Sequence, residues 1–112
     1  MLRIELENDD CGLHVMRLSG ALDGLTYLDL LKAFNQSIEK EAKRIVLDMN
    51  EVDYVSSAGL RVLLQGAKAL KETEGEIVLF GMNSGVKEVF SLSGFKTLFR
   101  TFSSEYDAVS TS

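Results

Sequence analysis

The chain has 112 residues, 46% of them hydrophobic and 26% charged, and a formal net charge of −5. This length suffices for one domain, residues 1–112, with a single core. The acidic balance argues against nucleic acid as a partner, because phosphates require a basic face. A single cysteine, Cys11, excludes an internal disulfide and a cysteine-based zinc site. The sequence shows no signal peptide and no apolar run near the ~20 residues that span a bilayer, so we expect a cytoplasmic protein with no membrane partner.

Two strands are predicted at the start of the chain. Leu2, Ile4 and Leu6 alternate with charged residues, which is typical of a strand with one solvated face. A polar turn over 7–12 separates this strand from a second one over 13–20. We expect the two strands to pair in antiparallel fashion.

A helix and a buried strand follow. The helix begins at Thr26, with Asp29 placed to complete a capping box, and its apolar residues recur at helical spacing as far as Ile38. The run over 44–49 is continuously apolar and rich in β-branched residues, which predicts a strand covered on both faces.

The second half of the chain repeats this alternation. An apolar stripe from Leu60 to Leu70 predicts a helix that ends at Gly75, and 76–80 repeats the buried-strand pattern. Strands that alternate with helices indicate an α/β fold with parallel neighbours and right-handed crossovers. The remaining expected elements are a short helix from Val86 closed by Gly94, an edge strand over 97–102 and a helix over 103–112.

Three loops run from a strand into a helix, over 23–26, 53–59 and 81–84. Right-handed crossovers place all such loops at the same end of the sheet, where ligands and partners of open α/β sheets usually bind. These three loops are therefore predicted to form one surface.

Catalysis at this surface has no support in the sequence. A nucleophilic Ser56 or Ser57 needs a base, and His14, the one histidine, lies within a predicted strand. As metal ligands the loops offer Asp23 and Asp53 alone. A small hydrolase that uses Ser57 is therefore disfavoured, and we expect a protein that is not an enzyme.

The four residues 56–59, Ser-Ser-Ala-Gly, are all small and directly precede the apolar stripe. One interpretation is a helix N-cap, in which Ser56 or Ser57 accepts from a free amide. The other is a modification site, because a phosphate on such a serine lies at the positive end of the helix dipole. Ala58 and Gly59 are expected to leave the surface flat, so that a partner can approach closely.

The stretches 21–26, 44–64 and 76–94 resemble the STAS domain family, specifically stand-alone anti-sigma-factor antagonists. The resemblance spans nearly the whole chain, and its most specific part is the Ser-x-Gly-Leu stretch that ends at Leu60. It implies an α/β fold in which a mixed sheet of four to five strands carries about four helices, packed mainly on one side.

The resemblance also implies a switch. An anti-sigma factor that is also a serine kinase of the GHKL type phosphorylates the serine two residues before the Gly-Leu pair, which is Ser57 here. Unphosphorylated protein captures this kinase and frees its target, phosphorylation blocks binding, and a metal-dependent serine phosphatase resets the cycle. ATP and Mg²⁺ belong to the kinase, so this chain is expected to need no cofactor. Many members carry Asp where this chain has Ser56, which makes Ser56 the second choice for modification.

The three loops and the resemblance together define the expected partner surface. Asp23 is either a contact residue or a turn former, and Met82 either a contact or a core residue. A STAS-like scaffold or ligand sensor that is never phosphorylated is the alternative function, and a monomer or weak dimer is expected. The expected partner-binding residues are Asp23, Gly24, Thr26, Asp53, Ser56, Ser57, Ala58, Gly59, Arg61, Met82, Asn83 and Ser84.

Overall fold

The computed structural model describes residues 1–110, so the last two residues of the helix expected over 103–112 lie outside the described residues. A five-stranded sheet has the strand order β1-β2-β3-β4-β5. β1 and β2 are antiparallel and the other neighbours are parallel, which confirms the predicted mixed sheet. The elements are β1 (Leu2–Asn8), β2 (Leu13–Leu22), α1 (Tyr27–Glu39), β3 (Arg44–Val55), α2 (Ser57–Lys71), β4 (Glu76–Phe80), α3 (Ser84–Ser93), a 3₁₀ turn (Phe95–Thr97), β5 (Arg100–Phe102) and α4 (Glu105–Ser110).

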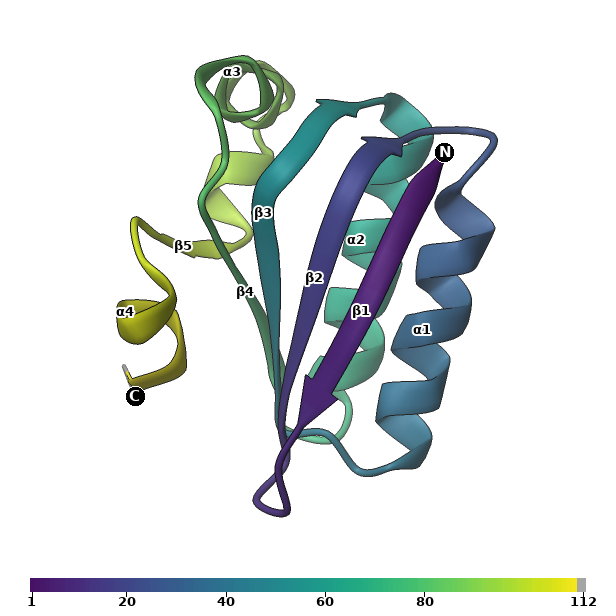
Figure 1. Cartoon of the computed structure of the whole chain (residues 1–112), viewed down its shortest axis with the longest axis vertical. Coiled ribbons are helices and arrows are strands. Elements are labelled where there is room, and N and C mark those ends of the chain that lie inside the picture. The colour runs from purple at the N-terminus through teal and green to yellow at the C-terminus, as the bar shows by residue number, and fades with distance from the viewer. Residues whose placement is uncertain (111–112) are drawn as a thin grey trace.

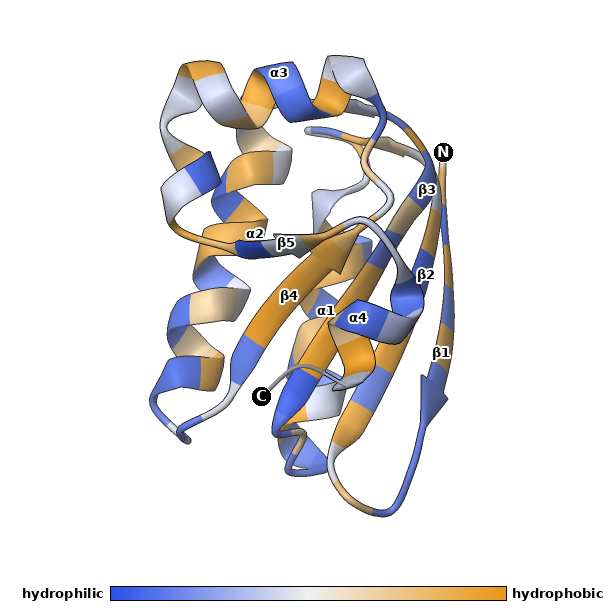
Figure 2. Ribbon diagram, turned by 90° about the vertical axis from the view of Figure 1, so that its left-hand side faces the viewer, coloured by the Kyte–Doolittle hydropathy of each residue, from blue (hydrophilic) through white to orange (hydrophobic). Residues whose placement is uncertain are grey.

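The helices lie mainly on one side of the sheet, as expected. α1 and α2 cover one face, and α4 lies on the other (Figure 1). β3 contributes side chains to the apolar clusters on both faces of the sheet, because successive side chains of a strand point to opposite faces. Ile45 and Leu47 belong to the large core under α1 and α2, whereas Val46 belongs to a smaller cluster with Ala108 of α4. The apolar strands between these layers are seen in Figure 2.

Close contact between α1 and α2 depends on a glycine. A Cβ at Gly66 would lie 2.5 Å from Cδ2 of Phe34, a side chain that is fully buried. The two helices therefore pack with an aromatic ring against bare backbone. Packing against Phe34 therefore requires glycine at position 66.

An arginine at the centre of an ionic cluster connects α4 to the sheet. Both terminal nitrogens of Arg17 contact the Glu105 carboxylate at 2.8 and 3.0 Å, and its side chain also reaches Glu7 and Asp48. These hydrogen bonds, led by the one to Glu105, raise the pKa of Arg17, and the bond to Arg17 lowers the pKa of Glu105. The cluster attaches the C-terminal helix to β2 and β3.

The predicted strand 44–49 and loop 53–59 were wrong at their boundary. β3 continues to Val55 and pairs with β2 as far as Leu22, two residues beyond the expected end at Gly20. The register shifts between the pairs Gly20–Val52 and Ala21–Tyr54, so Asp53 is an extra residue in a β-bulge. The polar residues near the end of β3 suggested a loop, but pairing with β2 continues the strand as far as Val55.

Two helix ends also differ from expectation. No capping box joins Thr26 and Asp29, because the Thr26 hydroxyl is used within the preceding loop, and α1 begins at Tyr27. α2 ends at Lys71 and not at Gly75, and the residue with positive φ after it is Glu74.

The last predicted strand is shorter than expected. The segment over 97–102 starts with the end of the 3₁₀ turn, and only Arg100–Phe102 forms β5 at the edge of the sheet. Among residues 1–110, no helix has the length and apolar character that crossing a membrane requires.

Candidate functional site

The start of α2 lies at the carboxyl end of the parallel strands. The Ser56 amide donates to the Leu22 carbonyl at 2.9 Å, and the Leu60 amide donates to the Ser56 carbonyl at 2.9 Å. These bonds place the loop that follows β2 beside the first turn of α2. Two of the three predicted loops therefore meet, at the upper end of the molecule in Figure 1.

Ser56 is the N-cap of α2. Its backbone is extended, with φ −95° and ψ 178°, and its hydroxyl accepts from the Gly59 amide at 3.3 Å. The side chain is half-buried. The capping interpretation of the small-residue stretch is therefore correct for Ser56, and the hydroxyl of Ser56 is engaged.

Ser57, the first residue of α2, differs from its neighbour. It is exposed, and within residues 1–110 its hydroxyl has no hydrogen-bond partner. The amides of Ser57 and Ala58 also lack acceptors in the described part of the chain, as the first N–H groups of a helix do. An exposed hydroxyl thus lies beside two free donors at the positive end of the helix dipole.

Gly59 has a different role from the one expected. A Cβ there would lie 2.6 Å from the Leu22 carbonyl oxygen and 2.9 Å from Leu22 Cγ. The residue is buried and faces the sheet. Its small size lets α2 approach β2, so the structure gives Gly59 a packing role, and its contact with a partner stays a prediction.

The loop after β2 is held by its own polar side chains. Asp23 Oδ1 accepts from the Leu25 amide at 2.9 Å, so Asp23 has the turn-forming role considered for it, and its contact with a partner stays a prediction. The Thr26 hydroxyl donates to the Ala21 carbonyl at 2.8 Å and accepts from the Asp23 amide at 3.0 Å. Thr26 is only 6% exposed, and its hydroxyl is used inside the loop, so the structure gives it a role in holding the loop and its partner contact stays a prediction. Gly24 is exposed, with open space where a Cβ would stand.

The third loop lies at the same end of the sheet but is supported by β3. β4 stops at Phe80, and the chain then runs past its end. Asn83 Nδ2 donates to the Val52 carbonyl at 3.1 Å, and its Oδ1 caps α3 by accepting from the Val86 amide at 2.8 Å. Met82 is half-buried against the main core, whereas Ser84 is exposed at the first position of α3.

Apolar side chains that the sequence interpretation missed are exposed in and around these loops. Leu25, in the loop after β2, is 94% exposed, and Leu28 in the first turn of α1 is 60% exposed. Tyr54, beside the bulge of β3, is 54% exposed. In the sequence these residues could have been noticed as apolar residues outside the periodic stripes. The charged residues Asp53 and Arg61, both predicted here, are also exposed.

His14 lies at the other end of the sheet. It is opposite Ile45, at the beginning of β3, whereas Ser57 follows the end of that strand. It is 1% exposed, its Nδ1 is 2.9 Å from Ser37 Oγ, and burial, followed by the charge of Lys40, lowers its pKa. His14 therefore cannot serve as a base for Ser57.

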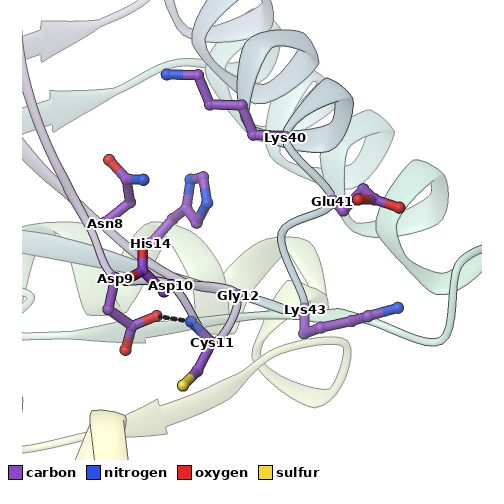
Figure 3. Close-up of a pocket in the computed structure, with 9 residues that line it drawn as sticks. All are labelled: Asn8, Asp9, Asp10, Cys11, Gly12, His14, Lys40, Glu41 and Lys43. Atoms are coloured by element: carbon purple, nitrogen blue, oxygen red, sulfur yellow. Dashed lines mark hydrogen bonds between the residues drawn. The ribbon is translucent and has the colours of Figure 1, made fainter.

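A pocket of about 490 Å³ lies between the turn that joins β1 to β2 and the segment 40–43 that follows α1 (Figure 3). The turn is closed by Asp9 Oδ1, which accepts from the Cys11 amide at 2.8 Å. Cys11 lies in the predicted turn and is exposed. Residues 1–110 hold no cluster of three His, Cys, Asp or Glu side chains that fits a metal ion.

Comparisons with known proteins agree on one family. The model of the STAS domain matches residues 5–108. The putative anti-sigma factor antagonist BtrV of Bordetella bronchiseptica is 39% identical over 88 residues, which cover 79% of this chain and 76% of that protein.

Two solved structures share the fold. The anti-sigma factor antagonist SpoIIAA in its unphosphorylated form has a TM-score of 0.82 at 21% identity, covering 96% of this chain and 93% of the other. The Bacillus cell fate determinant SpoIIAA in its phosphorylated form has a TM-score of 0.74 at 20% identity, covering 96% of each chain.

Proposed function

The chain belongs to the STAS domain family, and on that premise we propose that it is a phosphorylation-controlled binding switch for an anti-sigma factor. In its unphosphorylated form it binds a cognate anti-sigma factor that is also a GHKL-type serine kinase, so that the kinase releases its target. Phosphorylation of Ser57 ends this complex, and a metal-dependent serine phosphatase restores it. The relative BtrV, named as a putative anti-sigma factor antagonist, supports this role.

The observation that carries the proposal is the contrast between the two serines at the start of α2. The Ser56 hydroxyl is half-buried and caps the helix, whereas Ser57 is exposed and its hydroxyl is unbonded among the described residues. A kinase can reach Ser57 without unfolding the helix. A Ser56 that replaces the family's usual Asp keeps the capping role, because both residue types accept from the third amide of a helix.

The partner surface consists of exposed residues around Ser57. In this proposal the exposed Leu25 and Tyr54 supply apolar area, and the exposed Asp53 and Arg61 supply charge. A complex that excludes water from this surface would bury the position of the Ser57 hydroxyl. The same surface accepts a neutral hydroxyl and rejects a dianion.

The physical basis of the switch is local electrostatics. A phosphate adds about −1.5 to −2 charges, and the free amides at the start of α2 stabilise it in the unbound protein. In the complex the phosphate loses water, and an unpaired buried charge costs several kcal/mol. A loss of about 4 kcal/mol weakens binding roughly a thousandfold. A change of fold is not needed.

Calorimetric titration of the cognate kinase tests the proposal. We expect Ser57→Ala to bind like the wild type and Ser57→Asp to bind much more weakly. Ser84→Asp is the matched control, because Ser84 is also an exposed first residue of a capped helix. Equal affinities for the wild type, Ser57→Ala and Ser57→Asp would remove Ser57 from the switch.

Intact mass of protein isolated from its native cells separates the switch from an unphosphorylated scaffold or ligand sensor. The switch requires a species heavier by one phosphate that maps to Ser57. Phosphate on Ser56 would instead transfer the role to the second-choice residue.

A further inference from the structure

β1 forms one edge of the sheet and has no strand on its outer side among residues 1–110. It is seven residues long, whereas β5 at the opposite edge has three. Figure 2 shows β1 as the outermost strand of the sheet, far from β5. A long free edge presents unpaired amide and carbonyl groups to any strand that fits it.

The direction of these backbone groups follows from the turn between β1 and β2. The Asp9 amide donates to the Leu13 carbonyl at 3.0 Å, so this pair is hydrogen-bonded in the ladder. Hydrogen-bonded and non-hydrogen-bonded pairs alternate in an antiparallel ladder. Arg3, Glu5 and Glu7 therefore bond to β2, and the backbone groups of the intervening residues, including Ile4, point toward the free edge.

The side chains of β1 separate by face in the same alternation. Arg3 and Glu5 are exposed on the outer face, where Arg3 Nη2 lies 3.6 Å from Glu5 Oε1. Ile4 on the core side is only half-buried, whereas its partner Leu18 in β2 is 1% exposed. The edge therefore combines free backbone groups, incompletely covered apolar residues and charges of both signs.

We propose that β1 pairs with β1 of a second copy of this chain, antiparallel and with Ile4 opposite Ile4, so that the two sheets become continuous. In this register the outward backbone groups of Ile4 meet their equivalents in the second copy. On the core face, Leu2 of each copy lies opposite Leu6 of the other. On the outer face, Arg3 of each copy lies opposite Glu5 of the other, which gives two pairs of opposite charge. Cross-strand apolar pairs and opposite charges both stabilise such a ladder.

Several antiparallel registers of two β1 strands would pair their outward backbone groups, and the charged side chains distinguish between these registers. A ladder centred on Glu5 would place Glu5 opposite itself, and one centred on Arg3 would place Arg3 opposite itself. Like charges directly opposite each other destabilise a strand pair. Only the ladder centred on Ile4 pairs both charges with their opposites, which makes a second copy of this chain the partner that the edge fits.

Sedimentation equilibrium over a concentration series tests the pairing with charge variants. Wild type is expected to associate into dimers. Glu5→Arg should weaken association about tenfold, because it creates two like-charge pairs across the interface, besides the one that it creates with Arg17 within each copy. The double variant R3E/E5R should restore association, since it exchanges the two charges within each pair. Glu88→Arg on α3 is the matched control, exposed and remote from β1, and should associate like the wild type.

A disulfide checks the register directly. Opposed Cα atoms of a hydrogen-bonded pair are about 5.5 Å apart, which a disulfide can span. Ile4→Cys in a Cys11→Ser background should give a covalent dimer on oxidation, and Glu5→Cys in the same background should not. A wild type that stays monomeric, Glu5→Arg that associates normally, or cross-linking through Glu5→Cys instead of Ile4→Cys would each overturn the proposal. Ser57→Asp should leave association unchanged, so this test is independent of the switch.

Discussion

The starts of α2 and α3 look alike within the chain. In each, a capping side chain accepts from the amide three residues on, Ser56 from Gly59 at 3.3 Å and Asn83 from Val86 at 2.8 Å. In each, an exposed serine is the first helical residue. Local chemistry therefore offers two equivalent serines at two positive helix ends.

The two starts differ in how they are attached. α2 is held to the sheet by backbone, because the Ser56 amide bonds to Leu22 and Gly59 lies directly against the Leu22 carbonyl. α3 is held by a side chain, since Asn83 bonds to the Val52 carbonyl. The start of α2 is therefore fixed to β2 through the backbone, whereas the start of α3 depends on one side chain.

The largest contrast between the two starts is expected in phosphorylation by the cognate kinase. Ser57→Ala should abolish phosphate uptake, because it removes the accessible hydroxyl, whereas Ser84→Ala should be modified like the wild type. Intact mass after incubation with kinase and ATP measures this. Uptake lost in Ser84→Ala and kept in Ser57→Ala would reverse the assignment of the two helix starts.

A second contrast concerns the glycines in the first turns. Gly59→Ala should lower the free energy of unfolding by about 2 kcal/mol, because its Cβ meets a backbone carbonyl that cannot move freely. Gly85→Ala should raise it by about 0.5 kcal/mol, since its Cβ meets only Asn83 Oδ1 at 3.4 Å and alanine restricts the unfolded chain. Urea unfolding at equilibrium compares the two. A Gly59→Ala variant as stable as the wild type would contradict the close approach of α2 to β2.

The caps should differ by a smaller amount. Ser56→Ala is expected to cost about 1 kcal/mol, the usual value for an N-cap. Asn83→Ala should cost about 2 kcal/mol, because it removes the cap and the bond to Val52 together. Ser56→Asp should stay close to the wild type, as an aspartate also caps. Thermal unfolding of the three variants ranks them, and equal losses for both alanine variants would show that the bond to Val52 adds nothing.

The smallest effect should be shared by both starts. Ser57→Asp and Ser84→Asp should each raise the free energy of unfolding by about 0.3–1 kcal/mol, because a negative charge interacts favourably with the first turn of a helix. The gain should fall with added salt. Chemical denaturation at low and high salt measures it. A Ser57→Asp variant that is destabilised would indicate that this carboxylate is not tolerated at the helix start.

Several features of the fold were predictable because they depend on neighbours in sequence. Alternation in β1 and the apolar stripe of α2 predicted those elements correctly. The family resemblance singled out Ser57, whose modification stays a prediction. The bulge at Asp53 was not predictable, since it depends on the register between β2 and β3. The roles of Thr26 and Gly59 were also missed, because each is defined by a contact with the end of β2.

The sequence by itself determined the order of strands and helices, the family resemblance and the pair of candidate serines, because periodicity and spacing are properties of the chain. Tertiary structure alone decided which small residue is exposed and which is buried. Gly59 is covered because α2 lies close to Leu22, which is 37 residues earlier in the chain, whereas Ser57 is exposed at the same helix start. Burial depends on such distances, and no local pattern encodes them.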